Sequence, residues 1–336
     1  MGAGESITVV GAGSWGTALA IQFARAGHDT RLWGRAEDHL DRLQADRENQ
    51  HYLPGAMFPE ALNVEPDLGA AVSAASIVLV AVPSHAFRTQ LGHLRQYLRP
   101  GSPLAWATKG FEVATGKLPH EVALEVLGPD SKRAVLSGPT FAKEVGAGLP
   151  SAMTVAASDA DYARRLAETI SSDNFRAYTS ADIIGVEVGG AVKNALAIGA
   201  GISDGLGFGA NTRVALITRG LVEMTRLGVA LGAEPQTFMG LAGMGDLVLT
   251  CTDNQSRNRR MGLALAAGKT VAEAEEEIRQ VVEGVKAAEA VHRVAEANGV
   301  EMPICEKIFE IIYKGEQPIA AVQALMTRTL KSETGG

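Results

Sequence analysis

Three glycines near the start of the chain, spaced as Gly11-x-Gly13-x-x-Gly16, are the residues whose types and spacing point most clearly to chemistry. An apolar run at residues 7–10 precedes them, and a segment with helical spacing follows. Gly11 allows a tight turn, Gly13 lets a pyrophosphate approach the backbone, and Gly16 lets the helix pack on the strand. The free N–H groups of the first helical turn would face the phosphates. This pattern predicts a dinucleotide site.

The nucleotide preference depends on the end of the second expected strand, at residues 28–33. NAD sites usually carry Asp or Glu there, which binds the ribose hydroxyls. Here the strand is followed by Gly34 and Arg35, and Arg35 is able to pair with a 2′-phosphate, which favours NADP. The alternatives are a solvated Arg35 and an NAD site served by Glu37 or Asp38. We therefore expect NADP or NAD as the cofactor.

A candidate for proton transfer is Lys193, which lies among small and apolar residues in the segment 188–201. Lysine is rarely buried without a partner. An ammonium that loses hydration, or that faces a second cation such as Lys109, becomes a better proton donor. The glycines around it allow a ligand or another backbone to come close. The alternative is a lysine that packs along a helix and carries its charge out to water.

Three further polar side chains follow expected strands or glycine-rich turns. Lys109 follows the strand expected at residues 103–108, where ligands of open α/β sheets bind, and would meet a phosphate or a substrate oxygen. Thr140 offers a hydroxyl after the next strand, close in sequence to Gly138. Asp246 ends a glycine-rich run and would orient a lysine or accept a hydrogen bond from a substrate hydroxyl. A surface lysine, a turn residue and a helix N-cap are the corresponding alternatives.

An anion site is predicted at the start of the helix expected at residues 256–267. Ser256 is a natural N-cap, and Arg257 and Asn258 would lie on the first turn. Cations in a first turn oppose the helix dipole, so they indicate a bound anion more often than helix design. A guanidinium, an amide and free N–H groups would then surround the anion. A solvated basic turn is the alternative.

The elements that must position these residues are of two kinds. Up to about residue 179, strand-like runs alternate with helical segments, which is typical of a mostly parallel sheet with helices on both faces. After residue 180 only helical patterns follow. We predict an α/β Rossmann-type, dinucleotide-binding domain at residues 1–181, an all-α substrate domain at 182–331 and a disordered tail at 332–336. The expected strands are residues 7–10, 28–33, 77–82, 103–108, 134–136, 151–156 and 174–178. The expected helices are residues 17–26, 85–98, 119–127, 160–170, 182–205, 211–227, 256–267, 271–280, 284–297, 303–313 and 319–329.

Composition limits the class of protein. The 336 residues are 46% hydrophobic and 21% charged, which is typical of a globular protein of two domains. The net charge of −7 and the lack of a basic run argue against nucleic-acid binding. The two cysteines lie far apart, which fits a reduced, cytoplasmic setting. No His, Cys, Asp or Glu residues have ligand spacing, so we expect no metal.

One segment, residues 183–203, is apolar enough to be mistaken for a membrane span. It contains Glu187, Lys193 and Asn194. Because charge in a bilayer core is costly, we expect a buried helix rather than membrane insertion.

Together these motifs resemble those of the bacterial-type NAD(P)-dependent glycerol-3-phosphate dehydrogenase family over nearly the whole chain. Thr108 stands where members often have Ser, and Arg35 stands where many relatives carry His, which leaves the choice between NAD and NADP open. The resemblance rests on the motif at residues 11–19, Tyr52-Leu-Pro54, Val82-Pro-Ser84, Thr108-Lys-Gly110, Ser137-Gly-Pro139, the motifs at residues 189–194 and 241–246, Ser256-Arg-Asn258 and Val282-Glu-Gly284.

The resemblance implies reversible reduction of dihydroxyacetone phosphate to sn-glycerol 3-phosphate, which supplies glycerophospholipid synthesis. It implies that Lys193 accepts the proton in oxidation and donates it in reduction. The substrate residues that it implies are Lys109, Gly138, Thr140, Lys193, Asp246, Ser256, Arg257 and Asn258. The dinucleotide residues that it implies, besides the three glycines, are Ser14, Trp15, Arg35, Lys109, Ala142, Arg257, Val281 and Glu283.

Two other functions stay open. A 6-phosphogluconate or β-hydroxyacid dehydrogenase pairs the same domain types, and a nucleotide sensor would bind NADP without turnover. The anion site at residues 256–258 and the loop of Asp246 favour the triose phosphate. A sensor would need neither Lys193 nor Asp246. The expected partner is a small-molecule substrate, and a homodimer is compatible with the sequence.

Overall fold

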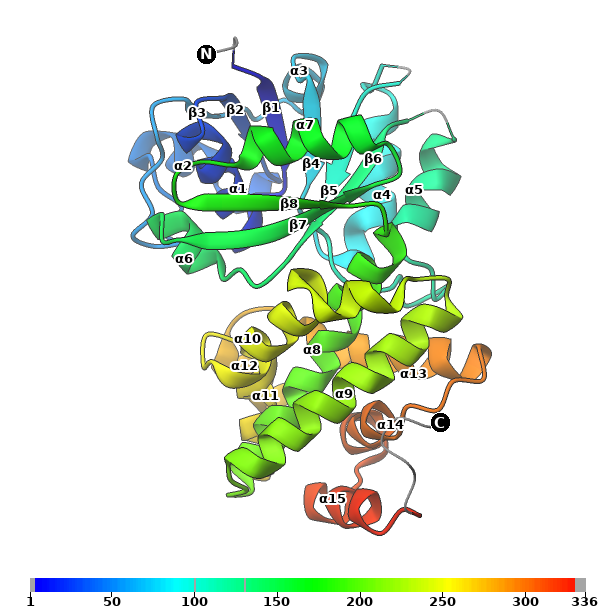
Figure 1. Ribbon diagram of the computed structural model, residues 1–336. Helices are drawn as coiled ribbons and strands as arrows, with labels where there is room; N and C mark the ends of the chain where they lie inside the picture. The colour runs from blue at the N-terminus through cyan, green and yellow to red at the C-terminus, as the bar shows by residue number, and fades with distance from the viewer. Residues whose placement is uncertain (1–3, 100, 130, 330–336) are drawn as a thin grey trace. The chain divides into compact units, whose positions relative to one another are not determined.

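The computed structural model describes residues 4–99, 101–129 and 131–329 (Figure 1). By its contacts the chain divides into two units. One is made of Met1–Ala191 with Leu231–Asp246, and the other of Val192–Ala230 with Leu247–Gly336. This division falls inside the helix α8 (Ile183–Gly205), later in the chain than the expected boundary at residue 181, because the first turns of α8 pack with the sheet. The tail expected at residues 332–336 lies outside the described residues.

The first unit contains one sheet. Its strands are β1 (Ser6–Val10), β2 (Asp29–Trp33), β3 (Leu62–Val64), β4 (Ile77–Val80), β5 (Leu104–Trp106), β6 (Arg133–Ser137), β7 (Ser151–Ala157) and β8 (Phe175–Ser180). Within the described residues they lie in the order β3-β2-β1-β4-β5-β6-β7-β8. Neighbouring strands are parallel except β6 and β7, which are antiparallel. The predicted mostly parallel sheet is confirmed.

Helices cover both faces of this sheet (Figure 1). One face packs against α1 (Ser14–Arg25), α2 (Leu40–Asp46), α6 (Ala142–Ala147) and α7 (Ala160–Ile170). The other face packs against α3 (Leu68–Ser73), α4 (Ser84–Arg95) and α5 (Pro119–Leu127). Val186 of α8 and Ala242 join the core on this second face. The central strands are therefore buried on both sides, which explains the continuous apolar sequence of β4.

The segment that returns to the first unit carries two short helical turns, η2 (Pro235–Met239) and the π-helix η3 (Leu241–Gly245). Asp182 joins this segment to the start of α8. Its carboxylate accepts hydrogen bonds from the backbone N–H groups of Gly185 and Glu234 and from the hydroxyl of Thr237. The start of α8 and the segment before Asp246 are thus tied to one buried carboxylate.

The second unit is helical, and none of its described residues form a strand. It contains the second half of α8 and then α9 (Ala210–Ala230), α10 (Asp246–Thr252), α11 (Arg257–Ala266), α12 (Val271–Ile278), α13 (Glu283–Ala297), α14 (Pro303–Phe309), the π-helix η4 (Glu310–Lys314) and α15 (Pro318–Met326). The helix expected at residues 303–313 therefore changes its hydrogen-bond pattern after Phe309. By length and composition α8 would be able to cross a membrane, but 89% of its most apolar window is buried, as in the core helix of a globular protein.

Candidate active site

The glycine-rich turn joins β1 to α1, as the spacing predicts. Gly11 has a φ of +120°, and a Cβ on it would lie 2.6 Å from the carbonyl oxygen of Ala81. A Cβ on Gly16 would lie 1.9 Å from the carbonyl oxygen of Gly11. Contact between backbones therefore requires glycine at both positions.

Gly13 is different, because packing does not explain it. Apart from Gly13 and its two chain neighbours, no described heavy atom lies within 4 Å of the place where its Cβ would be. Gly13 is also the N-cap of α1, and because it has no side chain it makes no cap hydrogen bond to the N–H groups of the first turn. The indole Nε1 of Trp15 is buried without a hydrogen-bond partner among the described residues. Open space, uncapped N–H groups and an unused donor fit the phosphates of a dinucleotide.

Asn49 supports this turn, and no motif in the sequence indicated it. Asn49 is buried, and its Nδ2 donates to the carbonyl oxygen of Ala12 and to the hydroxyl of Thr17, both at 2.9 Å. Its Oδ1 accepts from the N–H of Tyr52 at 3.0 Å, while Ser14 Oγ donates to the carbonyl oxygen of Tyr52 at 2.7 Å. The amide thus fixes the backbone around the predicted phosphate site.

The side chain of Arg35 lies just beyond the carboxyl end of β2 and is 69% exposed. Its guanidinium is 3.9 Å from Glu37 Oε2 and 3.8 Å from Asp38 Oδ1. The other oxygen of Asp38 accepts from the backbone N–H of Arg35 at 2.7 Å. A 2′-phosphate on Arg35 would therefore have to compete with two carboxylates. The geometry is compatible with NADP and with NAD.

Lys109 and Asp246 are brought together. Lys109 follows β5, and its Nζ lies 2.6 Å from Asp246 Oδ2. The carboxylate of Asp246 is 1% exposed and the side chain of Lys109 is 14% exposed. Gly190 lies against this lysine, because a Cβ there would lie 3.3 Å from Ser137 Oγ and 3.4 Å from Lys109 Cγ. The prediction that Asp246 orients a lysine therefore has a structural counterpart within the first unit.

The residues after β6 lie at the same edge of the sheet. A Cβ on Gly138 would lie 2.8 Å from Met153 Cα, so glycine allows β7 to come close. Thr140 Oγ1 donates to the carbonyl oxygen of Gly138 at 3.2 Å, and Ala142 begins α6. The hydroxyl of Ser137 is buried with no hydrogen-bond partner among the described residues. Because β1, β2, β5 and β6 run parallel, the glycine turn, Arg35, Lys109 and Gly138 all follow carboxyl ends at one edge.

Lys193 belongs to the second unit. It lies on α8, is buried, and donates from Nζ to Thr250 Oγ1 at 3.1 Å. Thr250 is itself buried on α10. The side chain therefore does not carry its charge out to bulk water. Sequence reasoning missed Thr250, because a single threonine in an apolar helix carries no spacing signal.

The start of α11 is partly as predicted. Ser256 Oγ accepts from the N–H of Arg259 at 3.2 Å, which confirms the N-cap. Asn258 Nδ2 donates to Asn194 Oδ1, and its Oδ1 accepts from the N–H of Gly284, both at 2.9 Å. The amide of Asn258 thus links α8, α11 and α13. Arg257 is half-buried on the same turn.

Arg259 has a structural role that the sequence did not reveal. Its Nη2 lies 2.5 Å from Asp204 Oδ2, and Arg213 lies 2.8 Å from the other oxygen of this aspartate. Arg259 is therefore buried in an ion pair, whereas Arg257, on the same helix, is only half-buried. Val281 is 54% exposed, and Glu283 is the first residue of α13.

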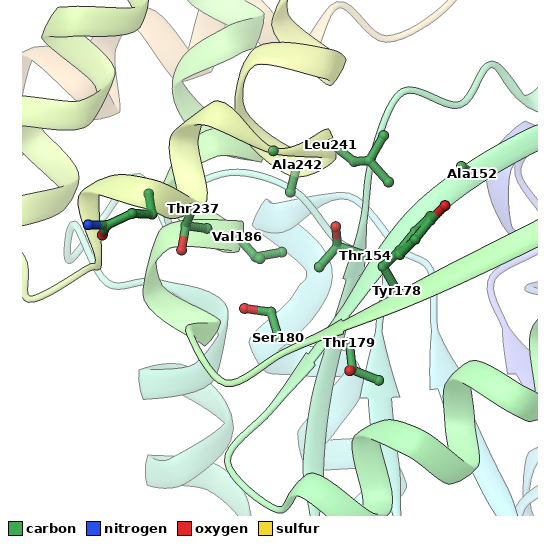
Figure 2. Close-up of a pocket in the computed structure, with 11 residues that line it drawn as sticks. Ala152, Thr154, Tyr178, Thr179, Ser180, Val186, Thr237, Leu241 and Ala242 are labelled. Atoms are coloured by element: carbon green, nitrogen blue, oxygen red, sulfur yellow. The ribbon is translucent and has the colours of Figure 1, made fainter.

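A groove of about 400 Å³ lies on the second face of the sheet in the first unit (Figure 2). The hydroxyls of Thr154, Ser180 and Thr237 surround it, with Val186 and Ala242 as apolar lining. None of the residues that line it is charged, and none is a predicted site residue. It adjoins the segment before Asp246 but supplies no group for the predicted chemistry.

Comparisons with known proteins agree with these motifs. Residues 6–163 match a family model described as the N-terminus of NAD-dependent glycerol-3-phosphate dehydrogenase, and residues 182–323 match the model of its C-terminus. The chain is 56% identical over 330 residues to an NAD(P)+ glycerol-3-phosphate dehydrogenase of Aliivibrio fischeri, covering 98% of this chain and 96% of the relative. It is 56% identical over 329 residues to the enzyme of that name from Aeromonas hydrophila, covering 98% of each.

Solved structures give the same result. The crystal structure of glycerol-3-phosphate dehydrogenase from Coxiella burnetii is 45% identical, with a TM-score of 0.93, and the match covers 97% of this chain and 99% of that one. The yeast glycerol-3-phosphate dehydrogenase is 26% identical with a TM-score of 0.83, covering 96% and 99%. The chain therefore belongs to the NAD-dependent glycerol-3-phosphate dehydrogenase family.

Proposed function

We propose that this chain catalyses the reversible NAD(P)H-dependent reduction of dihydroxyacetone phosphate to sn-glycerol 3-phosphate, and that it supplies glycerophospholipid synthesis. The observation that carries the proposal is Lys193, an ammonium buried among small residues on α8 and held by the hydroxyl of Thr250. A buried, oriented ammonium is suited to stabilise a developing alkoxide and to donate a proton to it.

The first unit would hold the dinucleotide. The N–H groups at the start of α1 would bind its pyrophosphate, with Gly13 leaving the space. When bound, the reduced nicotinamide supplies the hydride. The other residues that we propose for this site are Gly11, Ser14, Trp15, Gly16, Arg35, Lys109 and Ala142 from the first unit, and Arg257, Val281 and Glu283 from the second.

The substrate residues have separate tasks in this proposal. Lys193 donates the proton to the carbonyl oxygen in reduction and accepts it in oxidation. Asp246 holds the ammonium of Lys109 in one orientation, so that Lys109 can meet a substrate oxygen. Arg257 and the N–H groups at the start of α11 anchor the phosphate, which fixes the reacting carbon and lowers the entropic part of the barrier. The remaining substrate residues that we propose are Gly138, Thr140, Ser256 and Asn258.

The cellular setting that we propose is the cytoplasm, where the two buried thiols of Cys251 and Cys305 would stay reduced.

The assembly that we propose is a homodimer. Light scattering of the purified protein across a range of concentrations distinguishes a dimer from a monomer.

The test of the function is a substrate panel with the purified protein. We expect the near-ultraviolet absorbance of NADPH or NADH to fall with dihydroxyacetone phosphate, and to fall far more slowly with unphosphorylated dihydroxyacetone. We expect no reduction of NADP by 6-phosphogluconate. Turnover of 6-phosphogluconate, or tight NADPH binding with no turnover of the triose phosphate, would reject the proposal in favour of a different dehydrogenase or a nucleotide sensor.

A further inference from the structure

Glu187 makes contacts that the proposed reaction does not use. It lies in the first half of α8, and its side chain is 1% exposed. Oε1 accepts hydrogen bonds from the indole Nε1 of Trp106 at 2.8 Å and from the backbone N–H of His120 at 3.0 Å. Oε2 lies 2.6 Å from His120 Nδ1. One carboxylate thus joins three elements of the first unit, namely α8, the end of β5 and the start of α5.

Burial and neighbouring charges both act on the two titratable groups of this contact. Burial raises the pKa of Glu187, against the hydrogen bonds from His120 and Trp106. Burial of the His120 ring lowers its own pKa, but the hydrogen bond and the charge of Glu187 outweigh this, so that the pKa of His120 lies above its ordinary value. Glu121 and Arg133 face the ring from α5 and β6 and act on it in opposite directions. The side chain of His120 is 27% exposed, whereas that of Glu187 is 1% exposed, so water reaches only the histidine end of the pair.

Two of the elements that Glu187 joins, β5 and α8, are also those that Lys109 follows and that carry Lys193. Trp106 is the last residue of β5, the strand that Lys109 follows. Glu187 precedes Lys193 on α8 by fewer than two helical turns. A shift of α8 along the sheet would therefore move the ammonium of Lys193. Apolar packing alone resists such a shift weakly, because it lacks the direction of hydrogen bonds.

We propose that Glu187 is a positioning residue for the reaction. Its hydrogen bonds to Trp106 and His120 fix α8 on β5 and so set the place from which Lys193 transfers its proton. The inference rests on the proposed function. Replacing a buried ion pair by apolar groups is often neutral for stability. A role in stability alone would therefore not require this carboxylate, whereas a role in placing α8 does.

The test compares Glu187→Ala with Glu187→Gln. The alanine variant removes all three hydrogen bonds, and we expect kcat to fall about tenfold to a hundredfold with KM changed by less than about threefold. Glutamine keeps an acceptor for Trp106 and offers an N–H to the unprotonated Nδ1 of His120. We therefore expect Glu187→Gln to restore kcat to within about threefold of the wild type. All assays use temperatures at which circular dichroism shows each variant folded.

Glu223→Ala is the matched control, because Glu223 is also a buried glutamate and accepts two backbone hydrogen bonds, but lies on α9 in the second unit. We expect it to lower Tm and to leave kcat unchanged. A kcat for Glu187→Ala within about twofold of the wild type, with a loss of Tm like that of the control, would overturn the inference.

Should Glu187→Ala fail to fold, His120→Ala takes its place, since it removes only the partly exposed partner. A fall in kcat without a matching change in KM supports the inference, and an unchanged kcat overturns it. The wild type is measured beside every variant. If the wild type does not reduce dihydroxyacetone phosphate, the proposed function is rejected, and this inference, which rests on it, is rejected as well. If the wild type and all variants are equally active, only the inference fails.

Discussion

The ammonium of Lys109 and the carboxylate of Asp246 lie 2.6 Å apart, although 137 positions separate them in the chain. The π-helix η3 places Asp246 there, and π-helices are frequent at functional sites. Gly243 allows the backbone to pack closely, because a Cβ on it would lie 2.3 Å from the carbonyl oxygen of Phe238. Backbone packing thus explains the glycine at this position of the run before Asp246.

This ion pair gives the first prediction. Lys109→Met and Asp246→Asn each remove one partner of a largely buried pair, so each should lower the free energy of unfolding by roughly 3 kcal/mol. The double variant should lose less than the sum of the two, because the second change removes a group that already lacks this partner. Urea denaturation of the four proteins measures the coupling. Strictly additive losses would show that the contact contributes nothing of its own.

The second prediction concerns Gly13. Since no atom of the described chain lies near the place of its Cβ, Gly13→Ala should leave Tm almost unchanged. If the pyrophosphate occupies that space, the methyl group should raise the Kd for NADPH by about tenfold or more. Fluorescence titration with NADPH measures the affinity.

Gly92→Ala is the control for this variant. Outside its chain neighbours and the backbone of its own helix, Gly92 also has no described atom within 4 Å of its missing Cβ, but it lies within α4. Alanine there should stabilise the protein by about 0.5–1 kcal/mol without changing the Kd for NADPH. Equal nucleotide affinity in both variants would argue that the phosphates bind elsewhere.

The third prediction concerns Arg257, the half-buried cation at the start of α11. Arg257→Ala should raise KM for dihydroxyacetone phosphate by at least about tenfold, because a charge-assisted contact to the phosphate is lost. Its slow turnover of unphosphorylated dihydroxyacetone should change little. Initial rates with both ketones measure the difference, and an equal loss for both would contradict a phosphate contact.

The fourth prediction is a pH dependence of stability that comes from Glu223. Burial raises its pKa to about 7, against the hydrogen bonds from the N–H groups of Ile304 and Cys305. Because the folded state holds this proton more tightly than the unfolded state, the contribution is complete below the unfolded pKa of 4.5. It is lost as the pH rises through about 7, and amounts to on the order of 3 kcal/mol.

Glu223→Gln should remove this part of the pH dependence. Glutamine cannot ionise, and its N–H₂ group faces a backbone donor, so the variant should be less stable than the wild type at pH 5 by about 1–3 kcal/mol. The difference between the two proteins should shrink towards pH 8. Urea denaturation at several pH values measures it, and parallel curves for both proteins would refute the assignment.

The general architecture could be predicted because long elements have clear local signals. The helices Pro119–Leu127 and Ala160–Ile170 have the bounds that the sequence indicated, since Pro119 and the N-cap Asp159 mark where they begin. The elements β3, α2, α3, α6 and α10 were missed, because segments of three to seven residues are too short for a period to be recognised. The antiparallel direction of β7 comes from pairing between strands, which has no local signal.

The candidate site was predictable where a motif has a fixed place beside a strand or a helix start. The glycine turn, Lys109, Asp246 and the N-cap Ser256 are of this kind. The sequence did not predict residues that act through distant partners. Asn49 contacts residues 32 and 37 positions away, and Glu187 contacts residues 67 and 81 positions away. Such pairs are set by the tertiary fold and leave no spacing in the sequence.

Asn258 shows a different limit. Its place on the first turn of α11 indicated an anion contact, yet its amide is joined to Asn194 and to the backbone of Gly284. A buried polar side chain at a helix start serves either the ligand or a neighbouring helix, and only the fold shows which partners surround it. The anion contact of Asn258 stays a prediction.

Lys193→Ala is the variant that tests the proposed chemistry most directly. Titration with NADPH and the rate of NADPH oxidation by dihydroxyacetone phosphate are measured on the wild type and on this variant side by side. We predict that the variant binds NADPH with nearly the wild-type Kd while its turnover falls by about three orders of magnitude or more, since both the proton donor and the positive charge that stabilises the forming alkoxide are lost. Turnover equal to that of the wild type would contradict the assignment of proton transfer to Lys193.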